Sequence, residues 1–112
     1  DTLKHFEVEY RVITTCTWYK RQLSYFGGFR EDGEHYWENF SDTCSGNSSY
    51  KFTCIASPLG KQYNFNIFCW KSWTFTPDTI TVQLYWDGVL THEEKGCKDN
   101  FGNPSIWYSY KP

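Results

Sequence analysis

The feature that most constrains this fold is an alternation of apolar and polar residues with a period of two. Such alternation is typical of β-strands with one buried and one solvent-facing side. It first occurs over residues 6–12, and its parity continues to Trp18, which predicts a long or bulged first strand. Four later runs repeat the pattern: 50–56, 63–69, 80–86 and 106–110.

Turn signals divide these runs into short strands. Asp87-Gly88 lies between two apolar stretches and predicts a type I′ hairpin, because both turn residues need a positive φ. Asp32-Gly33 predicts a second hairpin. Helix is restricted to a single turn, at 20–25 or 93–97. We therefore predict an all-β antiparallel two-sheet sandwich of seven or eight strands, with a jelly-roll or cupin-like variant left open.

The length of 112 residues suits one domain, residues 1–112, with a largely aromatic core. Apolar residues make up only 39% of the chain, but 6 Trp, 9 Tyr and 9 Phe can each bury a large area. The expected core residues are those on the inward parity: Val8, Tyr10, Val12, Phe52, Phe65, Ile67, Val82, Leu84 and Trp86.

Five cysteines indicate an oxidising compartment, and we expect a secreted monomer with at least one disulfide. The start at Asp1, without Met, suggests that a targeting segment has been removed, and Asn39 and Asn47 begin glycosylation sequons. An odd count leaves an odd number of thiols, and we expect one. The disulfide candidates are Cys16, Cys54 and Cys69 on inward parity, and Cys44 and Cys97 in polar segments.

The chain lacks the motifs of an activated nucleophile, a phosphate-binding loop or a zinc-binding helix, so we expect no enzyme, catalytic residue, cofactor or metal site. Acidic residues around His35, over 31–42, could bind a cation, but a solvated hairpin tip explains them better. A Cys97–His92 nucleophile pair conflicts with an oxidising compartment. The net charge of −2 gives no general attraction to nucleic acid, and no apolar run is long enough to span a membrane.

Aromatic residues outside the inward parity are the main candidates for binding. Such rings could stack on sugars or anchor a protein partner, or a change of strand parity could turn them inward. These residues are Tyr19, Phe68, Trp70, Tyr85 and Trp107. The Trp70–Trp73 segment is the best single patch, and Lys98 and Asp99 lie in a polar loop suited to recognition.

Phe52-Thr53-Cys54 is an aromatic-x-Cys tripeptide in a short, aromatic-rich chain with few cysteines. In these features the chain resembles small secreted effector proteins of plant-pathogenic fungi. The resemblance implies delivery to a host, with entry into host cells as one route, and binding to a host protein or recognition by an immune receptor. The alternative function is that of a secreted carbohydrate-binding module.

Overall fold

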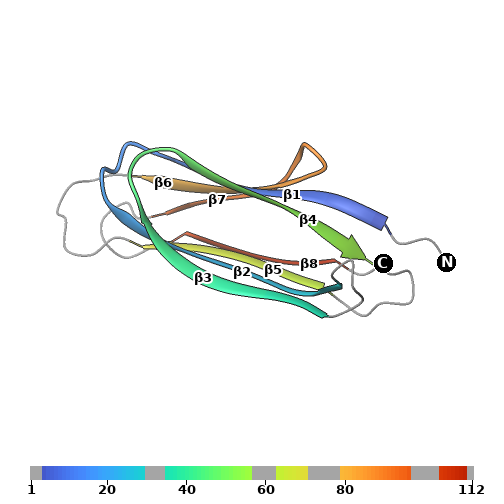
Figure 1. Ribbon diagram of the computed structural model, residues 1–112. Coiled ribbons are helices and arrows are strands. Elements are labelled where there is room, and N and C mark those ends of the chain that lie inside the picture. The colour runs from blue at the N-terminus through green and yellow to red at the C-terminus, as the bar shows by residue number, and fades with distance from the viewer. Residues whose placement is uncertain (1–3, 30–34, 57–62, 71–78, 97–103, 111–112) are drawn as a thin grey trace.

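The protein is a sandwich of two four-stranded antiparallel sheets, as a computed structural model shows (Figure 1). One sheet has the order β4-β1-β6-β7, with β1 at Lys4–Thr14, β4 at Ser48–Ala56, β6 at Ile80–Trp86 and β7 at Val89–Gly96. The other has the order β3-β2-β5-β8, with β2 at Tyr19–Phe29, β3 at His35–Cys44, β5 at Tyr63–Trp70 and β8 at Ser105–Tyr110. The structure describes residues 4–29, 35–56, 63–70, 79–96 and 104–110.

The predicted all-β sandwich is confirmed, with eight strands and no helix in the described ranges. The single helical turns expected at 20–25 and 93–97 are wrong, because the described parts of both segments pair as strands in β2 and β7. Nor do the described residues include a helix that is long and apolar enough to cross a membrane.

The first four strands have the connectivity of a Greek key that is divided between the sheets. Strands β2 and β3 form a hairpin in one sheet, whereas β1 and β4 lie side by side in the other. The chain then adds β5 beside β2, the hairpin β6–β7 beside β1, and β8 beside β5. This strand order places β3, β4, β7 and β8 at the four edges of the sandwich.

The predicted Asp87-Gly88 hairpin is confirmed between β6 and β7. Asp87 has φ 51° and Gly88 has φ 80°, as a type I′ turn requires. Asp87 also fixes the turn to β1, because its Oδ1 accepts a hydrogen bond from the Glu7 amide and its own amide donates to the Glu7 carbonyl, both at 2.8 Å. The second predicted hairpin is confirmed as the β2–β3 pairing, although Asp32-Gly33 itself lies outside the described residues.

Apolar side chains from both sheets fill the space between them. Seven of the nine predicted core residues are buried, and Phe52 and Trp86 are partly buried against them. Aromatic contacts link the sheets, as Phe65 of β5 lies 5.3 Å from Trp86 of β6 and 6.2 Å from Phe52 of β4, between ring centroids. The aromatic core expected from composition therefore forms.

The inward parity changes where the chain crosses from the first sheet to the second. On β1 the inward residues are even-numbered and include Val12, whereas on β2 they are odd-numbered and begin with Tyr19. Residues 15–18 make the crossing, so the expected continuation of the first strand to Trp18 is wrong. The expectation that Tyr19 faces outward is also wrong, since it is 0% exposed.

Candidate binding faces

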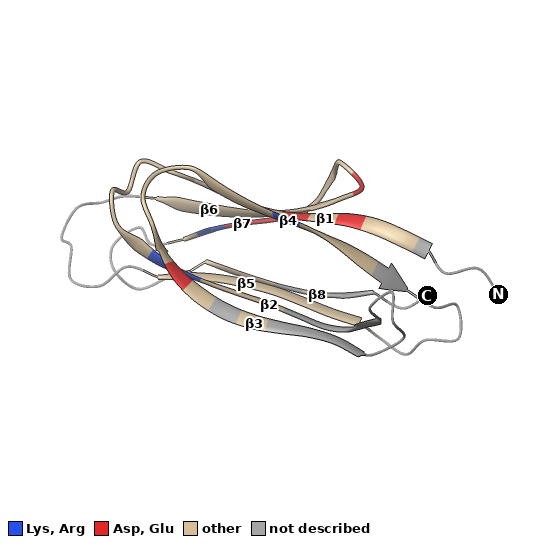
Figure 2. Cartoon of the chain, in the orientation of Figure 1, with Lys and Arg blue, Asp and Glu red and all other residues tan. Residues whose placement is uncertain are grey.

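The outer face of the β3-β2-β5-β8 sheet is almost uncharged. Its described side chains are amides, hydroxyls and aromatic rings, with Lys20 as the one charged group among them. They are Lys20, Gln22, Ser24, Asn39, Ser41, Thr43, Asn64, Asn66, Phe68, Trp70 and Ser105. Strand β5 is free of charged residues along its length, as Figure 2 shows in tan. We call this surface the neutral face.

Two aromatic rings on β5 lie next to each other on the neutral face. The rings of Phe68 and Trp70 are half-buried, with centroids 5.1 Å apart and planes tilted by 34°. Lys20 is the register partner of Trp70, and its Nζ lies 5.7 Å from the ring centroid of Trp18, which is 41% exposed. The predicted outward orientation of Phe68 and Trp70 is confirmed.

Two hydrogen bonds hold three of the amide side chains on the neutral face in place. Gln22 Nε2 donates to Asn39 Oδ1 at 3.1 Å, which links β2 to β3. Asn66 Nδ2 donates to the Ile106 carbonyl at 3.0 Å, which links β5 to β8. The sequence pattern marked Asn66 as outward but gave no reason to group it with the rings, because the pairing of β5 with β2 and β8 is a long-range property.

The outer face of the β4-β1-β6-β7 sheet is charged. Arg11 donates two hydrogen bonds to Glu9, from Nε to Oε2 at 2.8 Å and from Nη2 to Oε1 at 3.0 Å. These bonds hold the pKa of the Glu9 carboxyl below its usual value. The Arg11 guanidinium also lies 3.9 Å from the ring centroid of Tyr85, whose predicted outward orientation is confirmed. A longer ion pair joins Lys51 and Glu7 at 3.8 Å. We call this surface the charged face.

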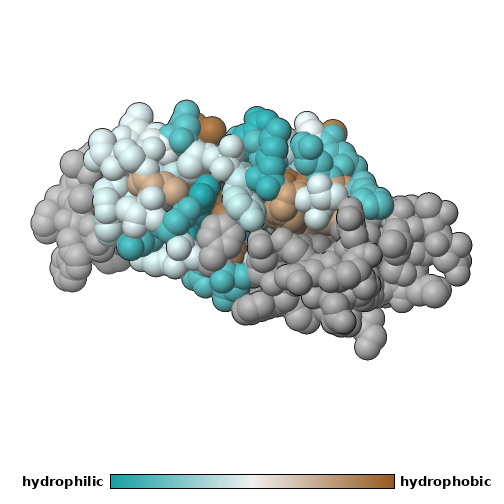
Figure 3. Space-filling view, viewed as in Figure 1, coloured by the Kyte–Doolittle hydropathy of each residue, from teal (hydrophilic) through white to brown (hydrophobic). Residues whose placement is uncertain are grey.

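Figures 2 and 3 show the molecule from the edge formed by β3 and β4. Charged residues occur along β1 and β7, and hydrophobic atoms are visible only in small separate areas of the described surface in this view. The residues of the two outer faces differ in charge, with Lys20 alone on the neutral face and two ion pairs on the charged face, among the described side chains. A charged ligand would find ion-pair partners on the charged face. A neutral ligand would bind the neutral face without removing charged side chains from water.

A polar cluster lies between the sheets beside this edge. Arg21 of β2 is buried, and it donates from Nε and Nη2 to Asp42 of β3 at 3.0 and 2.6 Å. These bonds raise the pKa of Arg21 and lower that of Asp42. Nearby, the Tyr19 hydroxyl lies 2.7 Å from both the Gly46 carbonyl and Ser48 Oγ, and burial raises its pKa to about 12. Sequence reasoning missed this cluster, since a charged residue at an inward position breaks the pattern.

The cysteine predictions are met in part. Cys16, Cys54 and Cys69 are buried as their parity indicated, whereas Cys44 is half-buried at the end of β3 rather than in a turn. Burial raises the pKa of the Cys44 thiol. No disulfide joins any two of these four residues. A single leftover thiol would require two disulfides among the five cysteines, and at least one of these would have to join two of the four residues named above. The predicted single leftover thiol is therefore wrong. The expected disulfide is absent among these four residues, and Cys97 lies outside the described residues.

Several predicted site residues lie outside the described part of the structure. Trp73, Lys98 and Asp99 belong to this group, and of Trp107 only the backbone in β8 is described. Residues 31–34 of the acidic segment 31–42 lie outside the described residues, and the Asp42 carboxylate is bound by Arg21.

The two sequon asparagines and His92 can also be placed. Both Asn39 and Asn47 are exposed, and the ring of His92 on β7 lies 4.8 Å from that of Tyr108 on β8, between centroids.

Within the described residues, no group of three or more His, Cys, Asp or Glu side chains is arranged to hold a metal ion. In that part of the chain, the candidate functional features are therefore the neutral face, the charged face and the interior polar cluster. No protein-family model matches the chain, and neither a curated protein nor a solved structure matches it.

Proposed function

We propose that this chain is a secreted, non-enzymatic binding protein whose neutral face binds a neutral glycan. The observation that carries the proposal is the placement of the paired Phe68 and Trp70 rings among amide and hydroxyl side chains, with one charge among the described groups. The cysteine content and the sequons support secretion, and the missing catalytic motifs support a non-enzymatic role.

The chemistry of a sugar matches this arrangement of side chains. A pyranose has an apolar face of C–H groups, which can cover an aromatic ring, and a rim of hydroxyls that both donate and accept hydrogen bonds. Asn and Gln side chains supply both donors and acceptors, and hydroxyls do the same. Asn39 and Asn66 are already oriented by neighbouring groups, so less conformational entropy is lost when a ligand binds.

Affinity electrophoresis tests the proposal directly. The chain is run through native gels that contain soluble mannan, β-glucan or xylan, and a glycan array then identifies the preferred oligosaccharide. We expect retardation by at least one neutral polysaccharide and its loss in Trp70→Ala and Phe68→Ala. Tyr85→Ala is the matched control, because it removes a half-buried ring from the opposite face.

The control variant must keep the binding of the parent chain, and all variants must keep the parent thermal unfolding profile. Trp70→Tyr retains a ring and should retain part of the retardation. A lack of binding to every neutral glycan, or equal losses in Tyr85→Ala and Trp70→Ala, would contradict glycan binding by the neutral face.

A second candidate is a protein partner on the charged face. Arg11 packs over Tyr85 on this face, and Arg and Tyr often contribute most of the binding energy of an interface. Leu90 pairs with Tyr85 and is 43% exposed, so an apolar side chain lies beside them. This role agrees with the host-protein binding that the resemblance to fungal effectors implies. Salt separates the two candidates, because a charged interface weakens as ionic strength rises whereas neutral glycan binding changes little.

A further inference from the structure

Asn47 is an exposed residue in the connection 45–47 between β3 and β4, and it begins the sequon Asn47-Ser48-Ser49. Its Oδ1 accepts a hydrogen bond from the Thr14 amide at 2.9 Å. Its Nδ2 makes no hydrogen bond within the described residues. N-linked glycosylation uses only the amide nitrogen and keeps the carbonyl oxygen. The bond that holds this side chain is therefore compatible with a linked sugar.

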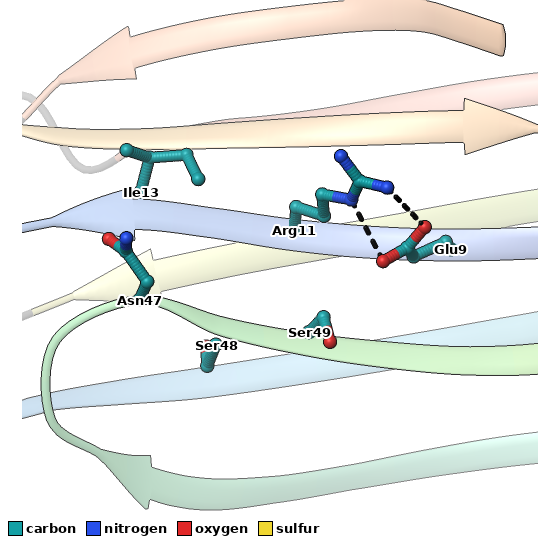
Figure 4. A pocket seen from close by; sticks show the side chains of 6 residues that line it. All are labelled: Glu9, Arg11, Ile13, Asn47, Ser48 and Ser49. Atoms are coloured by element: carbon teal, nitrogen blue, oxygen red, sulfur yellow. Dashed lines mark hydrogen bonds and ion pairs between the residues drawn. The ribbon is translucent and has the colours of Figure 1, made fainter. Parts of the chain in front are cut away.

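The surface beside Asn47 has room for that sugar. Two shallow hollows meet at Asn47 and Ile13, with volumes of about 300 and 530 Å³. Figure 4 shows Ile13 and Asn47 at one end of the smaller hollow and the Glu9–Arg11 pair at the other. Ile13 is 42% exposed on this face, so a sugar bound there would cover an apolar side chain.

The middle and last residues of the sequon also suit this arrangement. The Ser48 hydroxyl lies 2.7 Å from the Tyr19 hydroxyl of the interior cluster, although Ser48 also lines the smaller hollow. Ser49, whose hydroxyl completes the sequon, is exposed. The folded structure therefore leaves the acceptor side of this sequon open to solvent.

The other sequon has a different setting. Asn39 lies within β3, opposite Ser24 on the neutral face, and its Oδ1 accepts from Gln22. A glycan at that position would lie over the side chains that we assign to ligand binding. The Asn47 sequon is next to the opposite face, where a glycan leaves the neutral face open.

We infer that Asn47 carries an N-linked glycan whose first N-acetylglucosamine packs on Ile13. In the modification, Asn47 Nδ2 forms a bond to the anomeric carbon of a lipid-pyrophosphate-linked oligosaccharide. The bond between that carbon and the pyrophosphate oxygen breaks, the lipid pyrophosphate leaves with the electron pair, and Nδ2 loses one proton. No oxidation or reduction takes place. The inference is independent of glycan binding by the neutral face.

Occupancy is measured by intact mass and peptide mapping after secretion from a eukaryotic host, with and without peptide-N-glycosidase. We expect a glycan on Asn47 in most molecules. Ser49→Ala should abolish it while keeping the Asn47–Thr14 hydrogen bond, and Asn39→Gln should leave it in place. An Asn47 that is unmodified in most secreted molecules would overturn the inference.

A double-mutant cycle tests the contact with Ile13. The parent and Ser49→Ala chains are compared in thermal unfolding, and the comparison is repeated in the Ile13→Thr background, which keeps a β-branched residue on the strand. We expect the glycan to raise Tm by about 2–4 °C in the parent and by less than about 1 °C in the Ile13→Thr background. Equal shifts in both backgrounds would show that the sugar does not pack on Ile13.

Discussion

The guanidinium of Arg21 points into the sandwich and donates two hydrogen bonds to the carboxylate of Asp42 across the β2–β3 pair. The side chain of Arg21 is 8% exposed and that of Asp42 is 38% exposed, so a buried cation is neutralised by an anion at the sheet edge. Removing the anion leaves the cation buried without its main partner. Replacing both groups with apolar side chains removes the charges together.

We predict that Asp42→Asn lowers the free energy of unfolding by about 2–3 kcal/mol, as expected for a buried charge that loses its partner. Because Asp42 is partly exposed, the estimate lies at the low end for such pairs. The double variant Arg21→Met/Asp42→Leu should recover most of the loss. Urea denaturation of the three chains measures both effects, and a double variant less stable than Asp42→Asn would show that the pair is worth more than apolar packing.

Acid should destabilise the protein through the same pair. The pKa of Asp42 is lowered in the folded state, so its stabilising contribution is complete above the pKa of an unfolded aspartate, about 3.9. This contribution decreases as pH falls below that value and is lost once pH passes the lower folded pKa. We expect Asp42→Asn to show a smaller drop in unfolding free energy between pH 7 and pH 3 than the parent chain. Equal decreases in the unfolding free energy of the two chains would show that other carboxylates, such as Glu9, cause the loss of stability in acid.

The sequence predicted the strands well because alternation and turn chemistry are local properties. Residues 80–86 and Asp87-Gly88 specify a strand and a type I′ turn without reference to the rest of the chain. The orientation of Tyr19 was not predictable in this way, because it depends on the point where the chain crosses between sheets. Arg21 also concealed the inward parity of β2, since its buried charge is neutralised by Asp42, on a strand distant in sequence.

The neutral face illustrates a second limit of sequence reasoning. The outward positions of Phe68 and Trp70 follow from alternation, but their polar neighbours come from strands that are distant in sequence. The pairing of β5 with β2 and β8 brings Gln22 and Ser105 to opposite sides of Phe68. Periodicity specifies which side of a strand a residue occupies, but not which strand lies beside it.

Two leucine-to-alanine variants compare the core with the surface. Leu84 is 0% exposed on β6, and Leu84→Ala should lower the unfolding free energy by about 2–5 kcal/mol through lost burial and the cavity left behind. Leu90 is 43% exposed on β7, and the same substitution there should change stability by less than about 0.5 kcal/mol. Chemical denaturation gives both values, and similar costs would contradict the exposed position of β7.

The β6–β7 turn can be tested at Gly88. With φ 80°, this residue adopts a conformation that costs a residue with a Cβ about 1 kcal/mol, although no atom lies within 4 Å of an added Cβ. We expect Gly88→Ala to lower the unfolding free energy by about that amount and Gly88→Asn to cost less, because Asn tolerates positive φ. A cost for Ala no greater than that for Asn would show that the turn relaxes to another type.

The last prediction concerns the number of thiols in the denatured, unreduced protein. Since no disulfide joins Cys16, Cys44, Cys54 or Cys69 to another of these four, a single bond through Cys97 is the most that the chain can form internally. We therefore expect three thiols in a secreted monomer that forms this bond and five in one that does not. Alkylation in denaturant, followed by mass spectrometry, counts them directly. A count of one would require a bond between two of the four cysteines and would contradict their arrangement here. In native buffer at pH 7, alkylation of Cys44 should be slow, because burial raises its pKa and leaves little thiolate.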